Sequence, residues 1–358
     1  MFKVIKKIPS YFMFRYMGWP RPLPMNLTFS LSYRCNSRCK TCNVYKKDSY
    51  ELTPDEWKKV FKSLGKAPFW VTISGGEPFL RDDLLEIVRA LYDNCRPAII
   101  NIPTNGILHN RIPDRVKEIA SYCKGSQIII NLSLDDIEER HDAIRGVPGN
   151  FEKALKSFNG LKKIHLDNLA LGIHTVISQF NVSRIPEIYD YLIKLNPDSY
   201  ITEIAEERVE LGTIGCAITP TLEDYSVAVE FLRSRLKKGS FSSVGRLTRS
   251  FRLEYYSMVQ RIMKEKRQII PCFSGFASAQ VAPDGDVWPC CIKAEPMGNL
   301  REHDFDFKKI WLSEKANNLR KSIKNGECFC PLANASYTNM LHDPKTLVKA
   351  SWNFITLK

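Results

Sequence analysis

Three cysteines near the start of the chain have a spacing that suits an iron–sulfur cluster. Cys35, Cys39 and Cys42 follow an alternating apolar run, with three and then two residues between them. Three thiolates on one short loop can hold three corners of a [4Fe–4S] cube, whereas a cube that only carries electrons normally takes four cysteines. The fourth iron would then lack a protein ligand. The spacing therefore predicts a cluster with one iron free to bind a reactive cofactor.

A second group of cysteines lies near the end of the chain, in a segment with its own turn and strand signals. Cys272 precedes an alternating run and a Pro-Asp-Gly turn, and the other members follow, namely Cys290, Cys291, Cys328 and Cys330. We interpret residues 269–335 as a small cysteine-rich unit. Three or four thiolates also suit tetrahedral zinc, so a zinc site is the alternative for either group.

The composition is that of an ordinary globular protein. The chain has 358 residues, 44% of them hydrophobic, which suits one large core and a smaller unit. Eleven cysteines without a secretory signal favour a reduced, cytoplasmic protein over a disulfide-bonded one. No run approaches the roughly 18 apolar residues needed to span a bilayer.

The net charge of +13 comes from Lys and Arg residues scattered along the whole chain. No nucleic-acid-binding module is recognisable, which argues against a nucleic-acid partner. Residues 1–24 mix aromatic and basic side chains, as an interfacial amphipathic segment does, although Pro9 interrupts them. Two interpretations of this arm have equal support: contact with the cytoplasmic face of a membrane, and packing against the protein.

Six apolar, β-branched runs alternate with helical patterns. They cover residues 25–32, 69–74, 98–102, 128–134, 169–177 and 200–205. This repeat predicts a parallel sheet with helices outside it, either a curved partial barrel or an open doubly wound sheet. Thr53, followed by Pro54 and Glu56, has the pattern of a capping box that starts a helix. Further helices are predicted over 251–266 and 307–321.

The candidate residues fall at the ends of these strands. The first cysteine loop follows the first strand, Gly75-Gly76-Glu77-Pro78 follows the second, Asn105 follows the third and Ser133 closes the fourth. Because functional sites of parallel α/β folds lie at the carboxyl ends of the strands, we expect these residues to converge on one rim.

The same patterns predict how the chain is divided. We expect an N-terminal arm (1–24), a core (25–215), a helical linker region (216–268), the cysteine-rich unit (269–335) and a C-terminal tail (336–358).

The cysteine loop followed by Gly75-Gly76-Glu77-Pro78 resembles the radical S-adenosylmethionine (SAM) superfamily, and the resemblance extends over roughly residues 25–205. It implies a partial (β/α)6 barrel in which three cysteines hold a [4Fe–4S] cluster. The amino and carboxylate groups of SAM would chelate the fourth iron. One-electron reduction would then cleave SAM to methionine and a 5′-deoxyadenosyl radical, because the open iron places the sulfonium beside its source of electrons.

The resemblance also implies roles for single residues in SAM binding. Glu77 corresponds to the acid that accepts from the SAM amino group, with Gly75 and Gly76 allowing a close approach of the backbone. Ser133 corresponds to the residue that contacts the ribose. Arg145 corresponds to the guanidinium that pairs with the SAM carboxylate. Two further residues of these strand ends complete the predicted SAM site, namely Pro78 and Asn105.

One position departs from the family pattern. The family usually has an aromatic residue just before the third cysteine, near the adenine, and this chain has Thr41 there. The adenine contact would then come from elsewhere, with Tyr33 and Tyr45 as the candidates.

The cysteine-rich unit resembles the SPASM and twitch extensions, which hold auxiliary iron–sulfur clusters in a subset of these enzymes. Only five cysteines are available here, so the resemblance implies one auxiliary [4Fe–4S] cluster. Its predicted ligands are Cys272, Cys290, Cys328 and Cys330, and Cys291 competes with Cys290.

The expected function is that of an enzyme that abstracts hydrogen from an unactivated carbon. A ferredoxin or flavodoxin would supply the electron. We favour a small or lipid-linked metabolite as the substrate over a peptide or protein side chain, because the chain shows no separate peptide-recognition module and its surface is basic. The alternative from another class is a non-catalytic zinc or iron–sulfur protein that engages an anionic partner.

Overall fold

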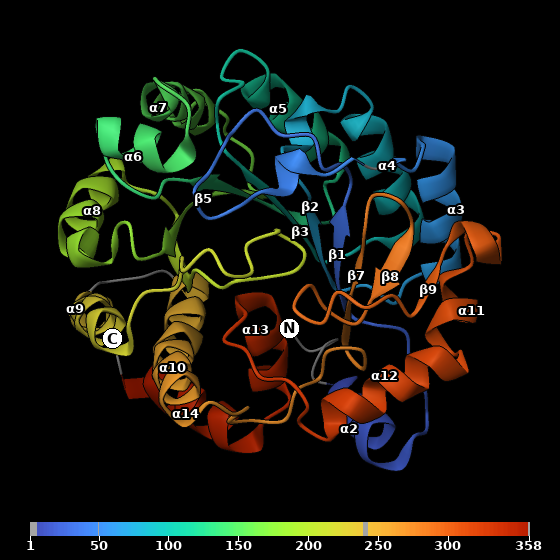
Figure 1. Ribbon diagram of the computed structural model, residues 1–358. Helices are drawn as coiled ribbons and strands as arrows, with labels where there is room; N and C mark the ends of the chain where they lie inside the picture. Colours follow the sequence, from blue (N-terminus) through green and yellow to red (C-terminus); the bar gives the residue numbers. More distant parts are fainter. Residues whose placement is uncertain (1–5, 49, 239–242, 357–358) are drawn as a thin grey trace.

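Nine strands form one sheet in the computed structural model, which describes residues 6–48, 50–238 and 243–356 (Figure 1). Their order is β6-β5-β4-β3-β2-β1-β7-β8-β9. All neighbouring pairs from β1 to β6 are parallel. These six strands are β1 (Asn26–Ser30), β2 (Trp70–Ser74), β3 (Ile99–Thr104), β4 (Gln127–Ser133), β5 (Leu169–Ile177) and β6 (Ser199–Ile204).

This order decides between the two architectures expected from the sequence. A doubly wound sheet reverses its strand order at a switch point. Here each strand from β1 to β6 pairs with the next one in sequence, and helices lie around the outside of the curved sheet (Figure 1). The predicted partial barrel is therefore confirmed.

The crossover helices pack their apolar sides on the sheet. On the first of them, Trp57 and Phe61 contact Phe29 of β1 edge to face, with ring centroids 5.4 and 5.3 Å apart. Thr53 Oγ1 accepts a hydrogen bond from Glu56 N, and Glu56 Oε2 accepts one from Thr53 N, so the predicted capping box is present. These helices are α3 (Pro54–Leu64), α4 (Leu84–Cys95), α5 (Ile112–Tyr122), α7 (Asn150–Lys162) and α8 (Ile185–Leu192).

An additional short helix, α6 (Glu138–Arg145), lies between β4 and α7. The apolar pattern did not predict it, because only Ala143 and Ile144 among its eight residues are apolar. It brings Arg145 to the rim of the barrel, as described below.

The region predicted as a linker belongs to the core. α9 (Leu222–Lys238) and α10 (Ser243–Glu265) pack against each other, and α10 starts eight residues before the predicted 251. Tyr225, Leu232, Tyr255 and Tyr256 on these helices are almost fully buried. The predicted helical character of this region is present, and its large aromatic side chains bury much apolar surface, so these helices pack as part of the folded core.

The cysteine-rich unit continues the same sheet. Its strand β7 (Ser278–Val281) pairs in parallel with β1, and β8 (Asp286–Trp288) and β9 (Gly298–Asn299) follow in antiparallel pairs. The helix predicted over 307–321 is broken into α11 (Phe307–Trp311) and α12 (Glu314–Lys324), because Ser313 Oγ accepts from Ala316 N and starts a new helix.

Both ends of the described chain pack on this unit. The predicted tail forms two helices, α13 (Ala333–Leu341) and α14 (Pro344–Thr356), and Asn26 of β1 donates to Thr338 of α13. The predicted arm forms α2 (Ile8–Met17), on which Tyr11 and Phe14 are buried. Of the two interpretations of the arm, packing against the protein therefore holds for the part of α2 that carries Tyr11 and Phe14. No helix of the described residues is long and apolar enough to cross a membrane.

Candidate iron–sulfur and S-adenosylmethionine site

The first cysteine loop is held from one side by the turn after β2. Gly76 N donates to Ser32 O over 2.7 Å, and Glu77 N donates to Arg34 O over 2.9 Å. A Cβ atom on Gly76 would lie 2.1 Å from Arg34 O, and one on Gly75, whose φ is +122°, would lie 2.2 Å from Ser32 O. The two glycines are therefore required where two backbones meet.

The end of α6 holds the loop from the other side. Arg38 N donates to Arg145 O and Lys40 N donates to Ile144 O, each over 2.8 Å. A Cβ atom on Gly146 would lie 2.4 Å from Arg38 O. The loop is thus fixed between the turn after β2 and the end of α6, which lie far from it in sequence.

Each thiol of this loop has a hydrogen-bond donor beside its sulfur. Ser37 N lies 3.4 Å from Cys35 Sγ, Val44 N lies 3.5 Å from Cys42 Sγ, and an arginine contacts Cys39. Burial raises the pKa of Cys35 to about 11 and that of Cys42 to about 12, so both are neutral thiols when no metal is bound. Donors at the sulfur favour the charged form that a metal would bind.

Glu77 joins the ends of β2 and β3. Its carboxylate accepts from Phe79 N over 3.2 Å, from Thr104 Oγ1 over 2.9 Å and from Asn105 N over 2.8 Å, and only 1% of the residue is exposed. Burial raises the pKa of Glu77 to about 7. The structure thus shows Glu77 fixing the loops of the rim. Its contact with the SAM amino group stays a prediction.

Asn105 links this rim to the cysteine loop. Its Nδ2 donates to Asn36 Oδ1 over 2.7 Å and lies 3.9 Å from Cys35 Sγ. Pro78, which follows Glu77, starts a single turn of 3-10 helix and is buried.

Arg145 lies between a carboxylate and a predicted cluster ligand. Its Nε is 2.8 Å from Asp135 Oδ2, and its Nη1 is 3.8 Å from Cys39 Sγ. The Arg145 and Asp135 side chains are 10% and 2% exposed. Burial alone would lower the pKa of Arg145, but Asp135 and Cys39 hold it above its ordinary value. A buried cation beside Cys39 stabilises the thiolate form of that residue.

Two further side chains, His174 and Glu203, lie on the inner side of the barrel beside Ser133. His174 of β5 is in register with Ser133, and its Nε2 is 3.0 Å from Glu203 Oε1 of β6. Burial alone would raise the pKa of Glu203, but His174, Arg208 and Arg252 lower it to about 2. Sequence patterns alone identify neither His174 nor Glu203, because only the register of β4, β5 and β6 brings them together.

The loop after β6 reaches back to the cysteine loop. Asn43 N donates to Leu211 O over 2.8 Å, and Lys47 Nζ donates to Val209 O over 3.0 Å. Arg208 on the same loop pairs with Glu206 over 3.0 Å. Burial raises the pKa of Glu206 to about 7. This loop, seen crossing the middle of Figure 1, closes the rim between β6 and β1.

The C-terminal cysteines divide into two environments. Cys290 and Cys330 are partly buried near Cys272, and the charges of Cys272 and Cys328 add to the effect of burial that raises the pKa of Cys290 to about 12. Cys291 lies instead beside the loop after β6, with Arg208 Nη1 3.9 Å from its sulfur. Cys290 thus lies with the other predicted ligands and Cys291 contacts a different loop, and the ligand set itself stays a prediction.

The candidate adenine contacts lie on the same loop, at different depths. Thr41 and Tyr33 are buried, and Tyr45 is partly exposed under the guanidinium of Arg38, 4.5 Å from its ring centroid. Tyr33 lines a cavity of about 380 Å³ between the cysteine loop, the loop after β6 and the β7–β8 hairpin. Its other lining residues include Lys47, Asp48, Val209, Glu210, Asp284 and Trp288.

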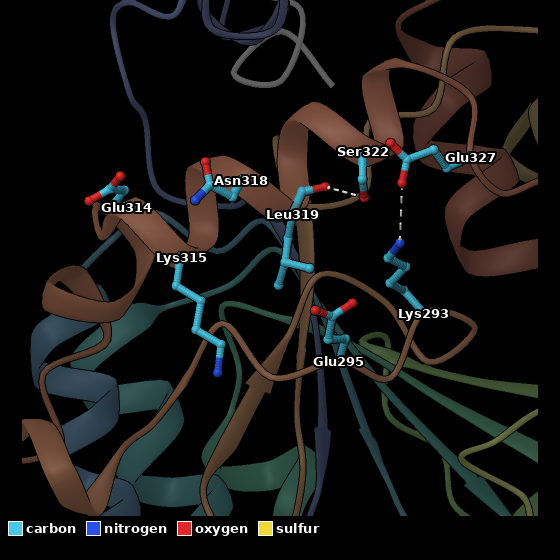
Figure 2. Close-up of a pocket in the computed structure, with 8 residues that line it drawn as sticks. All are labelled: Lys293, Glu295, Glu314, Lys315, Asn318, Leu319, Ser322 and Glu327. Atoms are coloured by element: carbon cyan, nitrogen blue, oxygen red, sulfur yellow. Dashed lines mark hydrogen bonds and ion pairs between the residues drawn. The ribbon is translucent and has the colours of Figure 1, made fainter.

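A second cavity, of about 500 Å³, is lined only by residues of the C-terminal unit (Figure 2). Lys293 and Glu327, whose charged groups are 4.0 Å apart, face each other across it. Lys293 N also lies 3.4 Å from Cys290 Sγ. This cavity therefore lies beside the auxiliary cysteines and apart from the first cysteine loop.

The two cysteine groups can be compared with iron–sulfur sites by the atoms they offer as ligands and by the hydrogen-bond donors beside those atoms. Among the residues that the structure describes, no three His, Cys, Asp or Glu side chains meet around one point as ligands of a single metal ion would. Both cysteine groups offer sulfur ligands, and the first has an N–H donor at each sulfur. Such donors are typical of cluster sites. The residues present therefore fit the groups that the resemblance implies.

Comparisons with known proteins agree with this assignment. Residues 29–192 match the model of the radical SAM superfamily, and residues 272–331 match that of SPASM, an iron–sulfur cluster-binding domain. The Fe-coproporphyrin III synthase of Methanosarcina barkeri is 31% identical over 52% of this chain and 44% of its own. The PqqA peptide cyclase of Bradyrhizobium diazoefficiens is 27% identical over 75% of this chain and 67% of its own.

The structures agree at the level of the fold. Streptococcus suis SuiB bound to its precursor peptide SuiA has a TM-score of 0.62 and 17% identity, covering 90% of this chain and 74% of that one. The chain spans less than half the length of the first curated relatives that it matches. It contains a radical SAM domain followed by a SPASM domain, the combination that its cysteine motifs resembled.

Proposed function

We propose that this protein is a radical SAM enzyme that cleaves SAM reductively and abstracts hydrogen from a carbon of its substrate, with one auxiliary [4Fe–4S] cluster. When bound and reduced, the first cluster supplies the electron that splits SAM into methionine and a 5′-deoxyadenosyl radical. The observation that carries the proposal is the cysteine loop, fixed between the Gly75–Gly76 turn and the end of α6 at the carboxyl edge of the barrel.

The residues of the rim have complementary roles in this proposal. Glu77 keeps the ends of β2 and β3 together, and Arg145 places a positive charge beside Cys39. His174, paired with Glu203, lies on the inner side next to the predicted ribose position, so its imidazole is placed to contact a substrate held there. The proposed auxiliary ligands are Cys272, Cys290, Cys328 and Cys330.

For the substrate we propose a small or lipid-linked metabolite. The rim cavity of about 380 Å³ is near the lower end of the range for small-molecule sites. The Fe-coproporphyrin III synthase acts, by its name, on a molecule that is not a peptide, whereas the PqqA peptide cyclase acts on a peptide. A peptide side chain entering the same cavity is the second candidate. Product analysis after incubation with each class distinguishes them.

The proposed electron donor is an acidic one-electron carrier such as a ferredoxin or flavodoxin, in a reduced cytoplasmic compartment. Arg38, Lys40 and Lys46 are exposed on the cysteine loop, and no acidic residue occurs before Asp48. Reversing the charges of Arg38 and Lys46 should slow reduction by flavodoxin and leave reduction by dithionite unchanged, because a small reductant needs no docking surface. Equal rates with flavodoxin would contradict this part of the proposal.

The catalytic proposal is tested by 5′-deoxyadenosine formation from SAM under dithionite. The wild type should form it, and Cys39→Ala should not. Cys216→Ala is the control, because Cys216 is exposed and far from both cysteine groups in sequence. Colourless protein that carries zinc and leaves SAM intact would support the non-catalytic alternative instead.

A further inference from the structure

The most exposed large apolar side chains of the described residues are concentrated in two places. Seven such side chains are at least 68% exposed. Two follow or end α2, namely Met17 (73%) and Trp19 (70%), and three lie on α14, namely Val348 (71%), Trp352 (68%) and Ile355 (70%). The remaining two, Tyr50 and Val227, each lie on a segment that carries no second side chain of this group. Isolated apolar residues on a surface need no explanation, but a concentration of them does.

The three residues of α14 share one face of the helix. Their spacing of four and then three residues places them in a single stripe. The opposite side of the helix is fixed to the protein. Ala350 is buried, Phe354 O accepts from Arg246 Nη2 over 2.7 Å, and Asn353 Nδ2 donates to Glu254 Oε1 over 3.0 Å. The stripe is therefore held outward by contacts on the other side.

The charges of α14 are all positive. Lys345 and Lys349 are exposed beside the stripe, and the helix contains no Asp or Glu. Two acidic residues lie close to the helix, and neither is on its exposed face. Asp343 precedes α14 and accepts a hydrogen bond from Thr346 N, and Glu254 accepts one from Asn353 on the inner side of the helix. An exposed face that combines tryptophan, aliphatic residues and lysine is typical of helices that lie in a membrane interface.

We propose that the exposed face of α14 docks on an anionic membrane surface. Tryptophan and the aliphatic side chains would enter the interface, and the two lysines would face anionic headgroups. Met17 and Trp19, at the far end of α2, provide a second apolar contact; the first half of α2 packs against His342, two residues before α14, through Tyr11 and Phe12. Figure 1 shows α2 and α14 along the same lower edge of the molecule.

This surface differs from the membrane contact predicted for residues 1–24. Tyr11 and Phe14 of that arm are part of the protein core, so deleting the arm would disturb folding and could not test membrane binding cleanly. Substitutions on α14 avoid this problem because the three apolar side chains contact solvent. The docking proposal is independent of iron and of SAM, so it stands or fails separately from the catalytic proposal.

The test is flotation of the full-length protein with vesicles of phosphatidylcholine, with and without phosphatidylglycerol. We expect the wild type to float with the anionic vesicles only, and less so at high salt. Val348→Ser/Trp352→Ser/Ile355→Ser should abolish flotation. Lys345→Glu/Lys349→Glu should weaken it by more than about twentyfold, since each lysine near an anionic surface contributes roughly fivefold.

Two controls keep the result interpretable. Val227→Ser removes an equally exposed apolar residue from α9 and should float like the wild type. Trp352→Phe keeps the apolar face and should still float, but it should show a smaller blue shift of fluorescence with anionic vesicles than the wild type, in which both Trp19 and Trp352 enter the interface. Unchanged melting temperatures would show that the variants fold.

Several outcomes would overturn the proposal. A wild type that ignores anionic vesicles, or a triple variant that floats as well as Val227→Ser, would do so. Light scattering in which the triple variant converts a dimer into a monomer would assign the stripe to contact between two copies of the chain instead.

Discussion

Replacing Arg145 by Met tests how the rim of the barrel is stabilised. Arg145 and Asp135 form an ion pair of 2.8 Å with side chains 10% and 2% exposed. Without the guanidinium, the Asp135 carboxylate would keep the hydrogen bond from Val176 N but would lose its counter-charge in a buried position. Removing one partner of a buried pair costs about 3–5 kcal/mol, and we expect Arg145→Met to lower the free energy of unfolding by this amount.

The matched double variant separates the buried charge from lost packing. Arg145→Met/Asp135→Asn contains neither charge, and replacing both partners of a buried pair is often nearly neutral. We therefore expect the double variant to be more stable than Arg145→Met alone by about 2 kcal/mol or more. Urea unfolding under anaerobic conditions, on proteins of matched iron content, measures both values.

This reasoning would be refuted if the losses of unfolding free energy caused by the two substitutions were additive. If the double variant is less stable than the wild type by the sum of the losses measured for Arg145→Met and for Asp135→Asn alone, Arg145 and Asp135 do not act as a pair. A loss below about 1 kcal/mol for Arg145→Met would likewise mean that Asp135 is not confined to a buried site.

Three further predictions concern the cysteine loops. Gly76→Ala should lower the free energy of unfolding by about 1–3 kcal/mol and lower the iron content, because the new Cβ would clash with a backbone oxygen that cannot move. The control is Gly125→Ala, whose new Cβ would meet the hydroxyl of a tyrosine side chain that can move, so this variant should keep its iron. Cys290→Ala should lose about half of the iron by colorimetric assay and Cys291→Ala should not, and the reverse order would refute the ligand assignment. Cluster assembly should release protons and proceed further at pH 8.5 than at pH 6.5. The reason is that the cluster binds thiolates, whereas burial raises the pKa of thiols such as Cys42 to about 12. Iron incorporation that does not vary with pH would contradict this prediction.

The sequence was sufficient for the parts of the fold that follow local patterns. The six strands appear where apolar, β-branched runs predicted them, and the capping box at Thr53 has both of its hydrogen bonds. The choice between a partial barrel and a doubly wound sheet required strand order, which depends on contacts between distant segments. The parallel pairing of β1 with β7 was missed for the same reason, because β7 has only four residues and lies about 250 positions away from β1.

The candidate site shows the same limit. Cysteine spacing and the Gly-Gly-Glu-Pro turn could be read from neighbouring residues. The ion pair between Arg145 and Asp135, and the approach of Arg208 to Cys291, depend on α6 and on the loop after β6, neither of which has a marked apolar pattern. The sequence could not decide between the two interpretations of the N-terminal arm, because amphipathic composition does not say whether water, lipid or protein covers the apolar side; in the structure Tyr11 and Phe14 are covered by protein, and Met17 and Trp19 are exposed.

The central claim is that three cysteines hold a cluster whose fourth iron binds SAM, and electron paramagnetic resonance of the reduced protein tests it most directly. We expect the signal of the first cluster to change when SAM is added, both in the wild type and in a variant in which Cys272, Cys290, Cys328 and Cys330 are all replaced. A signal that is identical with and without SAM would show that no iron of this cluster is open, and would contradict the account.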